Sequence, residues 1–248
     1  MSYLEFKDLT VEFNGFRAVN GINLSIDKGE IRVIIGPNGA GKTTIIDMIT
    51  GKTQPTYGAV LLDNQIISGK RPYQVANLNK IGRKFQGPNV FDYMTVYENL
   101  EVAYGGYTSL LKTILYRRKP EIVEELDEIL KQINLYEQKD EYPLYLSHGQ
   151  RQWLEIGMVL AQKPEIITLD EPTAGMSVEE TFKTGELIKT IMEDKTVIVI
   201  EHDIDFVKQI ASTITVLNQG EILAEGTYDE ITNNPEVIKV YLKSDDED

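Results

Sequence analysis

A glycine-rich segment near the start of the chain has the residue types and spacing that bind a polyphosphate. Residues 36–44 match the pattern G-x-x-x-x-G-K-[ST], in which backbone N–H groups at a helix N-terminus hold an anion. Lys42 is expected to reach the β- and γ-phosphates of a nucleotide, and the Thr43 hydroxyl to occupy one position on Mg²⁺. The residues expected to contact the nucleotide here are Gly36, Pro37, Asn38, Gly39, Ala40, Gly41, Lys42, Thr43 and Thr44.

The segments on either side of this loop are those that the pattern requires. Ile31–Ile35 is a largely apolar, β-branched run that predicts a buried strand. Thr44–Thr50 has the apolar residues of a short helix, and Gly51 is placed to end it. From average residue usage, a chance match to the pattern arises in roughly one chain in a hundred of this length. The flanking strand and helix make chance rarer still, so we interpret the segment as a nucleotide-binding loop.

A strand that ends in two carboxylates, Ile166–Glu171, supplies a second feature of a nucleotide site. On its own, an apolar run that ends in Asp-Glu is commonplace and is usually a strand that meets solvent. Downstream of a phosphate-binding loop, Asp170 is expected to hold Mg²⁺, directly or through water. Glu171, one residue later, could orient or deprotonate the water that attacks the γ-phosphate.

A third feature is the segment Leu146–Gln150, in which Ser147 and Gln150 have the spacing of an S-x-x-Q capping box. A helix is therefore expected to begin after Ser147. Its core face would be Trp153, Ile156, Gly157 and Leu160. A capped helix alone explains this pattern, but a helix N-terminus with an exposed serine and glycine is also a phosphate site. A second such site on one chain makes sense if it faces the nucleotide held by another subunit.

Composition restricts the class of protein. The chain has 248 residues, no cysteine and a net charge of −14, with the hydrophobic content of an ordinary globular protein. The absence of cysteine excludes disulfides and thiolate metal sites. The acidity argues against a nucleic-acid partner, because a polyanion needs a basic face. No apolar run approaches the ~18 residues of a spanning helix, and no signal-peptide pattern is present, so we expect neither a membrane span nor export.

Strand and helix signals follow one another in an order typical of an α/β core interrupted by a helical insertion. The expected strands are Tyr3–Phe6, Thr10–Phe13, Ile22–Ile26, Ile31–Ile35, Ala59–Leu62, Ile166–Leu169, Thr196–Ile200, Thr213–Leu217 and Glu221–Ala224. Turns are expected at Asn14-Gly15, Lys28-Gly29 and Tyr57-Gly58, and helices near Glu121–Ile133, Val178–Met192 and Asp203–Ala211. Residues from about 88 to 163 are mostly helical in pattern, and no linker separates independent domains.

These segments resemble the ATP-binding subunit of an ABC transporter, and the resemblance covers nearly the whole chain. The motifs occur in the family's order: Gly36–Thr44 as the phosphate loop, Gln86 as the Q-loop glutamine, Leu146–Gln150 as the signature segment, Ile166–Glu171 as the Walker B strand, Ala174–Ser177 as the D-loop and His202 as the switch histidine. The resemblance implies one domain over residues 1–248, an α/β P-loop NTPase core with an antiparallel β subdomain and an inserted helical subdomain. Residues 1–87 and 164–248 would form the core lobe, and residues 88–163 the helical subdomain.

The resemblance also implies roles for individual residues. Gln86 would contact Mg²⁺ and sense a membrane partner, and His202 would contact the γ-phosphate of ATP. Phe13 would lie against the adenine ring, although it could instead belong to the core. The implied catalytic residues are Glu171, His202 and Lys42, and the implied metal-binding residues are Thr43, Gln86 and Asp170.

The family's mechanism implies several partners. Two ATP-binding subunits, identical or different, pair head-to-tail and enclose two ATP molecules. Each ATP then lies between one subunit's phosphate loop and the other's Ser147, Gly149 and Gln150. Integral membrane permease subunits would hold the pair at the cytoplasmic face of the membrane, with Pro88–Leu100 lining the groove for one of their helices. A separate solute-binding protein would select the solute.

Finer resemblances point to the transported solute. Ile81–Gln86 and Thr95–Leu100 are similar to importers of the branched-chain amino-acid set, and residues 146–158 and 170–176 are most similar to the urea-uptake subunit. Two positions depart from the family's pattern. His148 replaces a glycine of the signature segment and would point to solvent or add a contact between subunits, and Ser177 replaces the aspartate that the D-loop often carries.

Other classes of ABC protein stay open at this point. These are a soluble ATPase acting on DNA or in protein synthesis, an accessory ATPase for cofactor assembly, and an exporter subunit. Chromosome and repair members need long coiled-coil or zinc-binding insertions, and translation members carry two cassettes, none of which this sequence has. A non-enzymatic binding module is the class that the combination of Lys42, Asp170, Glu171 and His202 disfavours most.

Overall fold

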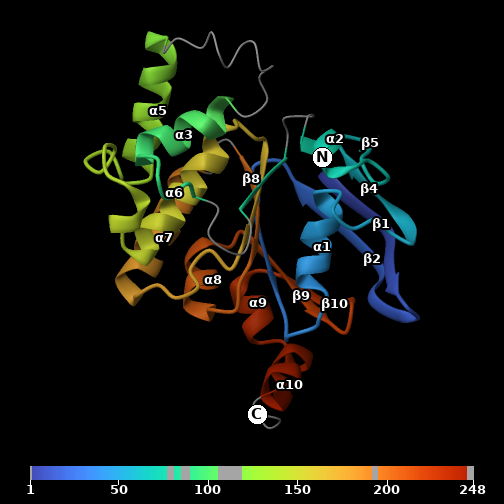
Figure 1. Ribbon diagram of the computed structural model, residues 1–248. Coiled ribbons are helices and arrows are strands. Elements are labelled where there is room, and N and C mark those ends of the chain that lie inside the picture. The colour runs from blue at the N-terminus through green and yellow to red at the C-terminus, as the bar shows by residue number, and fades with distance from the viewer. Residues whose placement is uncertain (1, 77–80, 85–89, 106–118, 192–194, 245–248) are drawn as a thin grey trace.

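The computed structural model describes residues 2–76, 81–84, 90–105, 119–191 and 195–244, which form two β-sheets and the helices around them (Figure 1). The smaller sheet is antiparallel, in the order β2-β1-β4-β5. Its strands are β1 (Ser2–Phe13), β2 (Phe16–Asp27), β4 (Tyr57–Leu62) and β5 (Gln65–Ile66). The predicted turn at Asn14-Gly15 joins β1 to β2, and both of its residues have positive φ, as a tight hairpin requires.

Two features of this sheet differ from the sequence-based expectation. Thr10–Phe13 is not a separate strand, because β1 continues past Asp8, which has a φ of 46° at an irregularity in the pairing with β2. Such a bulge accommodates an extra residue without ending the strand. Tyr57-Gly58 is not a turn but the start of β4, and a Cβ on Gly58 would lie 2.3 Å from the Lys7 carbonyl oxygen. The glycine there permits close approach of two strands.

The larger sheet has the order β10-β9-β3-β8-β7-β6. Its strands are β3 (Ile31–Ile35), β6 (Ile81–Lys84), β7 (Ile166–Asp170), β8 (Thr196–Ile200), β9 (Thr213–Asn218) and β10 (Glu221–Gly226). All neighbours pair in parallel except β9 and β10. β3, β7 and β8 are buried along their whole length, which explains their near-continuous apolar sequences.

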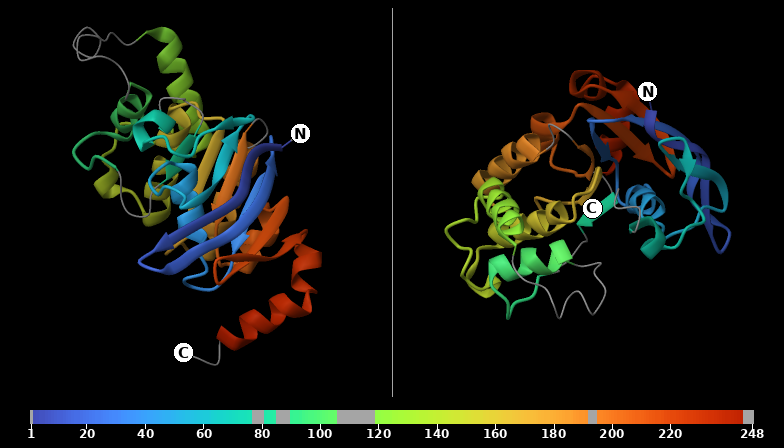
Figure 2. Two further views of the ribbon diagram at one scale, coloured as in Figure 1. Left: turned by 90° about the vertical axis from the view of Figure 1, so that its right-hand side faces the viewer. Right: turned by 90° about the horizontal axis from the view of Figure 1, so that it is seen from above.

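Helices cover both faces of the larger sheet. They are α1 (Lys42–Ile49), α2 (Pro72–Ala76), α3 (Val96–Gly105), α5 (Pro120–Gln132), α6 (His148–Ala161), α7 (Val178–Ile191), α8 (Ile204–Ile210), α9 (Tyr228–Thr232) and α10 (Pro235–Ser244), with a 3₁₀ turn at Pro143–Tyr145. Figure 1 shows α3, α5, α6 and α7 on one side of this sheet, and α1 with the smaller sheet on the other. In Figure 2, α9 and α10 extend beyond β10 at the C-terminal end. The predicted helices after residues 121, 147, 178 and 203 are therefore confirmed, although Met192 lies outside the described residues.

Alternate residues of the central strands point into two separate apolar clusters. Val33 and Ile35 of β3 join the cluster formed with α3, α5, α6, α7 and α8. Ile34, between them, joins the cluster that α1 forms with the smaller sheet. The position of α1 is thus fixed from both sides, by the parallel sheet and by β1, β2 and β4.

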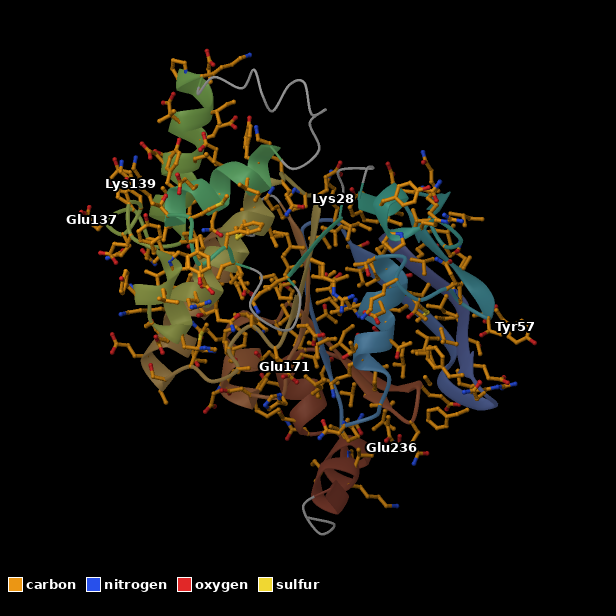
Figure 3. All side chains as sticks on the ribbon, in the orientation of Figure 1. Lys28, Tyr57, Glu137, Lys139, Glu171 and Glu236 are labelled. Carbon is orange, nitrogen blue, oxygen red and sulfur yellow. The ribbon has the colours of Figure 1, made fainter. Side chains whose placement is uncertain are left out.

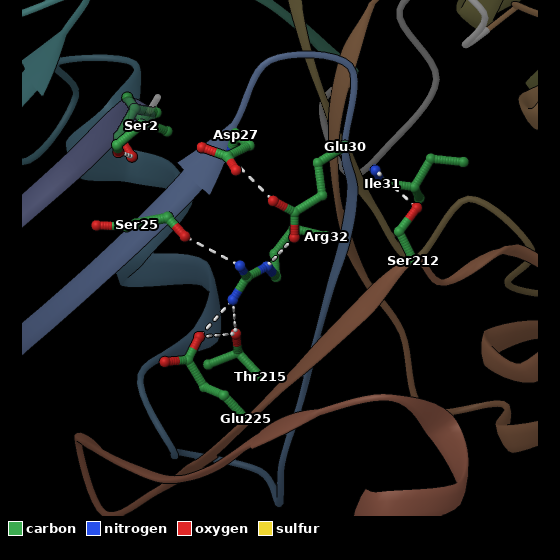
Figure 4. A network of polar contacts seen from close by, with 10 residues as sticks. Ser2, Ser25, Asp27, Glu30, Ile31, Arg32, Ser212, Thr215 and Glu225 are labelled. Atoms are coloured by element: carbon green, nitrogen blue, oxygen red, sulfur yellow. Dashed lines mark hydrogen bonds and ion pairs between the residues drawn. The ribbon is translucent and has the colours of Figure 1, made fainter.

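A buried arginine connects the two sheets. Arg32 of β3 is 6% exposed, and its guanidinium donates to Glu30 Oε1 (2.7 Å), Thr215 Oγ1 (2.9 Å) and the Ser25 carbonyl oxygen of β2 (2.9 Å). It also forms an ion pair with Glu225 of β10 (Figure 4). A guanidinium has a fixed fork of donors, and this network satisfies both terminal nitrogens and Nε.

We predict that Arg32→Met lowers the free energy of unfolding by about 2–3 kcal/mol, because it leaves the part-buried Glu30 carboxylate without its counter-charge and removes the hydrogen bonds to Thr215 and Ser25. Guanidinium denaturation of the full chain measures the change. Lys183→Met is the control, since the exposed Lys183–Glu179 pair is expected to contribute less than about 0.5 kcal/mol. Equal losses in the two variants would show that the network does not stabilise the fold.

Candidate functional site

The predicted phosphate loop connects β3 to α1 and lies against the backbone of two other strands. Gly36, Gly39 and Gly41 have φ values of 151°, 77° and 100°, which L-residues rarely adopt. A Cβ on Gly36 would lie 2.2 Å from the Leu217 carbonyl oxygen, and one on Gly41 would lie 2.5 Å from that of Ala18. Gly36 and Gly41 are therefore required by close backbone approach as well as by the turn itself, and Gly39 by the turn alone.

Lys42, the first residue of α1, has its ammonium group folded back over this loop. Nζ donates to the carbonyl oxygens of Gly36 (2.6 Å) and Pro37 (3.0 Å). Burial lowers the pKa of Lys42, and the negative charges of Glu171 and Asp170 oppose that shift. The Lys42 ammonium is thus held between the loop and two carboxylates, where it could bind a polyphosphate.

Asp170, at the carboxyl end of β7, is a buried carboxylate with unused acceptor capacity. It is 3% exposed, and among the described residues its Oδ2 accepts no hydrogen bond. Burial raises the pKa of Asp170, while the Arg83 guanidinium, whose Nη2 lies 3.9 Å from Oδ2, opposes the increase. An orphaned carboxylate oxygen at this position suits a hard cation such as Mg²⁺.

Glu171 follows β7 in a strained conformation. Its φ is 47°, unusual for a residue other than glycine, and its N–H donates to the Ile200 carbonyl oxygen of β8 at 3.0 Å. Figure 3 shows Glu171 between the helices on the left and α1 on the right. His202, which follows β8, has Nδ1 3.8 Å from Glu171 Oε1. The structure therefore brings Lys42, Asp170, Glu171 and His202 to the same edge of the parallel sheet.

Glu201 and Arg83 support this group and were not found from the sequence. The buried Glu201 accepts from the Thr173 backbone (3.1 Å) and hydroxyl (2.6 Å) and from the His202 N–H (3.1 Å). It thus ties the segment after β7 to the segment after β8. Arg83 of β6 forms an ion pair with Asp47 of α1 in addition to its contact with Asp170. In the sequence, the one sign of these contacts is a charged residue within an apolar strand (Arg83) or directly after one (Glu201), which needs a partner if it is buried.

The start of α6 does not contact Lys42, Asp170 or Glu171 through any hydrogen bond of the described residues; it contacts α7 instead. The predicted capping box is present, since Ser147 Oγ accepts from the Gln150 N–H (3.2 Å) and the Ser147 N–H donates to Gln150 Oε1 (2.9 Å). The Ser147 hydroxyl donates to Glu180 Oε1 of α7 at 3.0 Å. His148 is exposed, as one of the two expectations has it, and its Nε2 also lies 3.0 Å from the Ala174 carbonyl oxygen of the same chain.

Two further predicted residues have different outcomes. Phe13 is 49% exposed at the tip of the β1–β2 hairpin, where it pairs with Phe16, so the interpretation of Phe13 as a core residue is wrong. Its ring is available for stacking. Gln86 lies outside the described residues.

Comparisons with known proteins identify this arrangement. A sequence model of the family described as "ABC transporter" matches residues 19–174, and one described as "Branched-chain amino acid ATP-binding cassette transporter" matches residues 221–242. The chain belongs to the ABC transporter family. High-affinity branched-chain amino acid transport ATP-binding proteins BraF of Pseudomonas aeruginosa and LivG of Escherichia coli K12 are each 40% identical over 96% of this chain and 97% of the relative.

Solved structures show the same fold. The ADP conformation of MJ1267, an ATP-binding cassette of an ABC transporter, matches with a TM-score of 0.85 and 31% identity over 98% of this chain and 99% of that one. The dimeric post-hydrolysis state of the ATP-binding cassette MJ0796, bound to ADP and Pi, matches with a TM-score of 0.77 and 29% identity over 91% of this chain and 98% of that one. The chain is thus an ABC ATPase with an α/β fold, and the alternative of a soluble or accessory ABC ATPase is not favoured.

In the part of the chain that the structure describes, no helix has the length and apolar character to cross a membrane. In the same part of the chain, no group of three or more His, Cys, Asp or Glu side chains forms a ready-made metal cage.

We predict that Gly36→Ala lowers the free energy of unfolding by about 3 kcal/mol, because it combines backbone strain with overlap against β9. Gly39→Ala is the control: it also has positive φ, but no atom lies within 4 Å of its added Cβ. We expect it to cost about 1 kcal/mol. Equal losses in urea denaturation would contradict the close approach of the loop to Leu217.

Proposed function

We propose that this ABC ATPase powers an importer for a branched-chain amino acid or a similarly small solute. Two ATP-binding subunits would pair head-to-tail and bind two ATP molecules between them. The observation that carries the proposal is the separation of the residues into two groups. Lys42, Asp170, Glu171 and His202 share one edge of the sheet, whereas Ser147 contacts α7 of its own chain. A second subunit would bring the missing serine to the phosphate loop.

Similarity to a dimer supports pairing. The solved structure of MJ0796 bound to ADP and Pi is described as dimeric, and it covers 91% of this chain. Homodimer and heterodimer with a second ATP-binding subunit both fit the proposal. In either case the site residues on the α6 side would be Ser147, Gly149 and Gln150, from the opposite subunit.

The roles of the proposed site residues follow from their chemistry. The Lys42 ammonium would bind the β- and γ-phosphates in place of the carbonyl oxygens that it now contacts. Glu171 would orient the attacking water and accept its proton, and His202 would donate to the γ-phosphate. Thr43, Asp170 and Gln86 would hold Mg²⁺, which neutralises phosphate charge when bound. Phe13 would stack on the adenine ring.

The solute and the membrane partners are proposed from similarity. The relatives BraF and LivG are named for branched-chain amino acid transport and match along almost their whole length. Urea is the second candidate, because residues 146–158 and 170–176 are similar to the urea-uptake subunit. Permease subunits would hold the chain at the cytoplasmic face of the membrane, and a solute-binding protein would deliver the solute. In this assembly, residues 88–163 would form the helical subdomain that contacts the permease, and residues 1–87 and 164–248 the core lobe.

The test of this function is ATPase activity in vesicles that contain the chain with its permease subunits and binding protein. We expect leucine to stimulate hydrolysis several-fold over the activity without solute. Stimulation by urea and not by leucine would overturn the amino-acid assignment. Equal activity with and without either solute would favour an accessory ATPase.

We predict that Glu171→Gln abolishes steady hydrolysis while ATP-dependent pairing persists, because Gln keeps the shape of the side chain but is not a base. Phosphate release and sedimentation velocity measure the two properties. Rates of Glu171→Gln within about tenfold of the unaltered chain would contradict the assignment of Glu171.

We predict opposite effects of Asp170→Asn on stability and on hydrolysis. Because the pKa of Asp170 is raised in the folded chain, its ionised form destabilises the fold once the pH exceeds the unfolded pKa, and the neutral amide removes this penalty. The free energy of unfolding at pH 7 should rise, while Mg²⁺-dependent hydrolysis is lost. A less stable Asp170→Asn chain would show that contacts of the carboxylate outweigh its burial.

A further inference from the structure

The first turn of α6 has two donors that, in the proposed function, bind the γ-phosphate of ATP held by the other subunit. These are the Ser147 hydroxyl and the backbone N–H of Gly149. In the present structure both are directed to one carboxylate of the same chain. Ser147 Oγ donates to Glu180 Oε1 at 3.0 Å. Hydrogen bonds lower the pKa of Glu180: those from Ser177 and Ser147 contribute most, and the Gly149 N–H contributes least.

Glu180 also caps its own helix. Its Oε2 accepts from the Ser177 N–H and hydroxyl, both at 3.0 Å, and its N–H donates to Ser177 Oγ at 3.3 Å. This is a capping box at the start of α7, and it uses only one carboxylate oxygen. The contacts of Oε1 with α6 are therefore additional to what the cap of α7 requires.

The fit around Glu180 is close. A Cβ added to Gly149 would lie 2.5 Å from Glu180 Oε1 and 2.7 Å from its carboxyl carbon. The carboxylate therefore lies directly against the N-terminal turn of α6, at the end of a helix that favours an anion. A glycine at position 149 is what leaves room for it.

We propose that the Glu180 carboxylate takes the place of the γ-phosphate in the unpaired subunit. Glu180 occupies the signature segment there, and it must leave when ATP-driven pairing occurs. This inference rests on the proposed function. A hydroxyl has one proton, so Ser147 cannot donate to Glu180 and to a phosphate at once. Two anions at one helix end also repel each other. Displacement of Oε1 leaves the Ser177 cap intact, so the exchange needs no unfolding of α7. Glu180 therefore sets the ATP concentration at which two subunits close.

Glu180→Gln tests the proposal, because glutamine also forms capping boxes but lacks the charge. Glu179→Gln is the matched control: it removes the same charge from the adjacent residue, which is exposed and pairs with Lys183. Both are made in the Glu171→Gln background, and the ATP concentration for half-maximal dimerisation is measured by sedimentation velocity. We expect Glu180→Gln to lower this concentration about three- to tenfold, since charge-assisted hydrogen bonds are about twice as strong as neutral ones. Glu179→Gln should leave it unchanged.

The outcomes separate this inference from the function on which it rests. If all three chains dimerise at the same ATP concentration, Glu180 does not compete with phosphate and the proposal is overturned alone. If Glu180→Gln needs more ATP while its thermal midpoint is unchanged, Glu180 assists pairing and the proposal is also overturned. If none of the chains dimerises with ATP, the proposed head-to-tail function fails, and this inference fails with it.

Discussion

Parallel pairing of β3, β8 and β7 is the constraint on which the site depends. Ile200 of β8 pairs with Ile34 of β3 on one side and with Asp170 of β7 on the other. The three strands therefore end at the same level, and the segments that follow them begin side by side. Ligands of open α/β sheets bind at such carboxyl ends. The glycine loop, Asp170, Glu171 and His202 lie together because of this register.

The edge of the sheet that carries the proposed site is less favourable for stability than the core beneath it. Glu171 has a left-handed backbone, Asp170 has a buried oxygen without a hydrogen bond among the described residues, and two of the loop glycines, at positions 36 and 41, lie in close contact with other strands. Burial on two sides, by the helices and by the smaller sheet, compensates for these local costs. A nucleotide and its metal would satisfy the groups that the protein alone leaves unsatisfied.

Much of this arrangement could be predicted from local patterns. The strand, glycine loop and helix around residues 36–44, the apolar strands of the parallel sheet and the Ser147 capping box each depend on residues close in sequence, and each is confirmed in the structure. The errors occurred where tertiary contact decides conformation. Gly58 has the residue type of a turn, but it lies in a strand because the backbone of β1 approaches it too closely for a side chain.

Long-range polar contacts were beyond the reach of the sequence for the same reason. Glu201 and Arg83 look like ordinary charges beside apolar runs, and only the fold brings them to Thr173 and Asp170. Glu180 looks like one more acidic residue of an amphipathic helix. Its contact with Ser147 spans 33 positions and depends on how α6 and α7 pack, which no local pattern encodes.

The most direct test of the account is a crystal structure of the Glu171→Gln chain grown with ATP and Mg²⁺. The account predicts two chains related by a two-fold axis, with each γ-phosphate about 3 Å from the Ser147 hydroxyl of the opposite chain. ATP bound to the phosphate loop with Ser147 of every chain more than about 10 Å from any phosphate would contradict it.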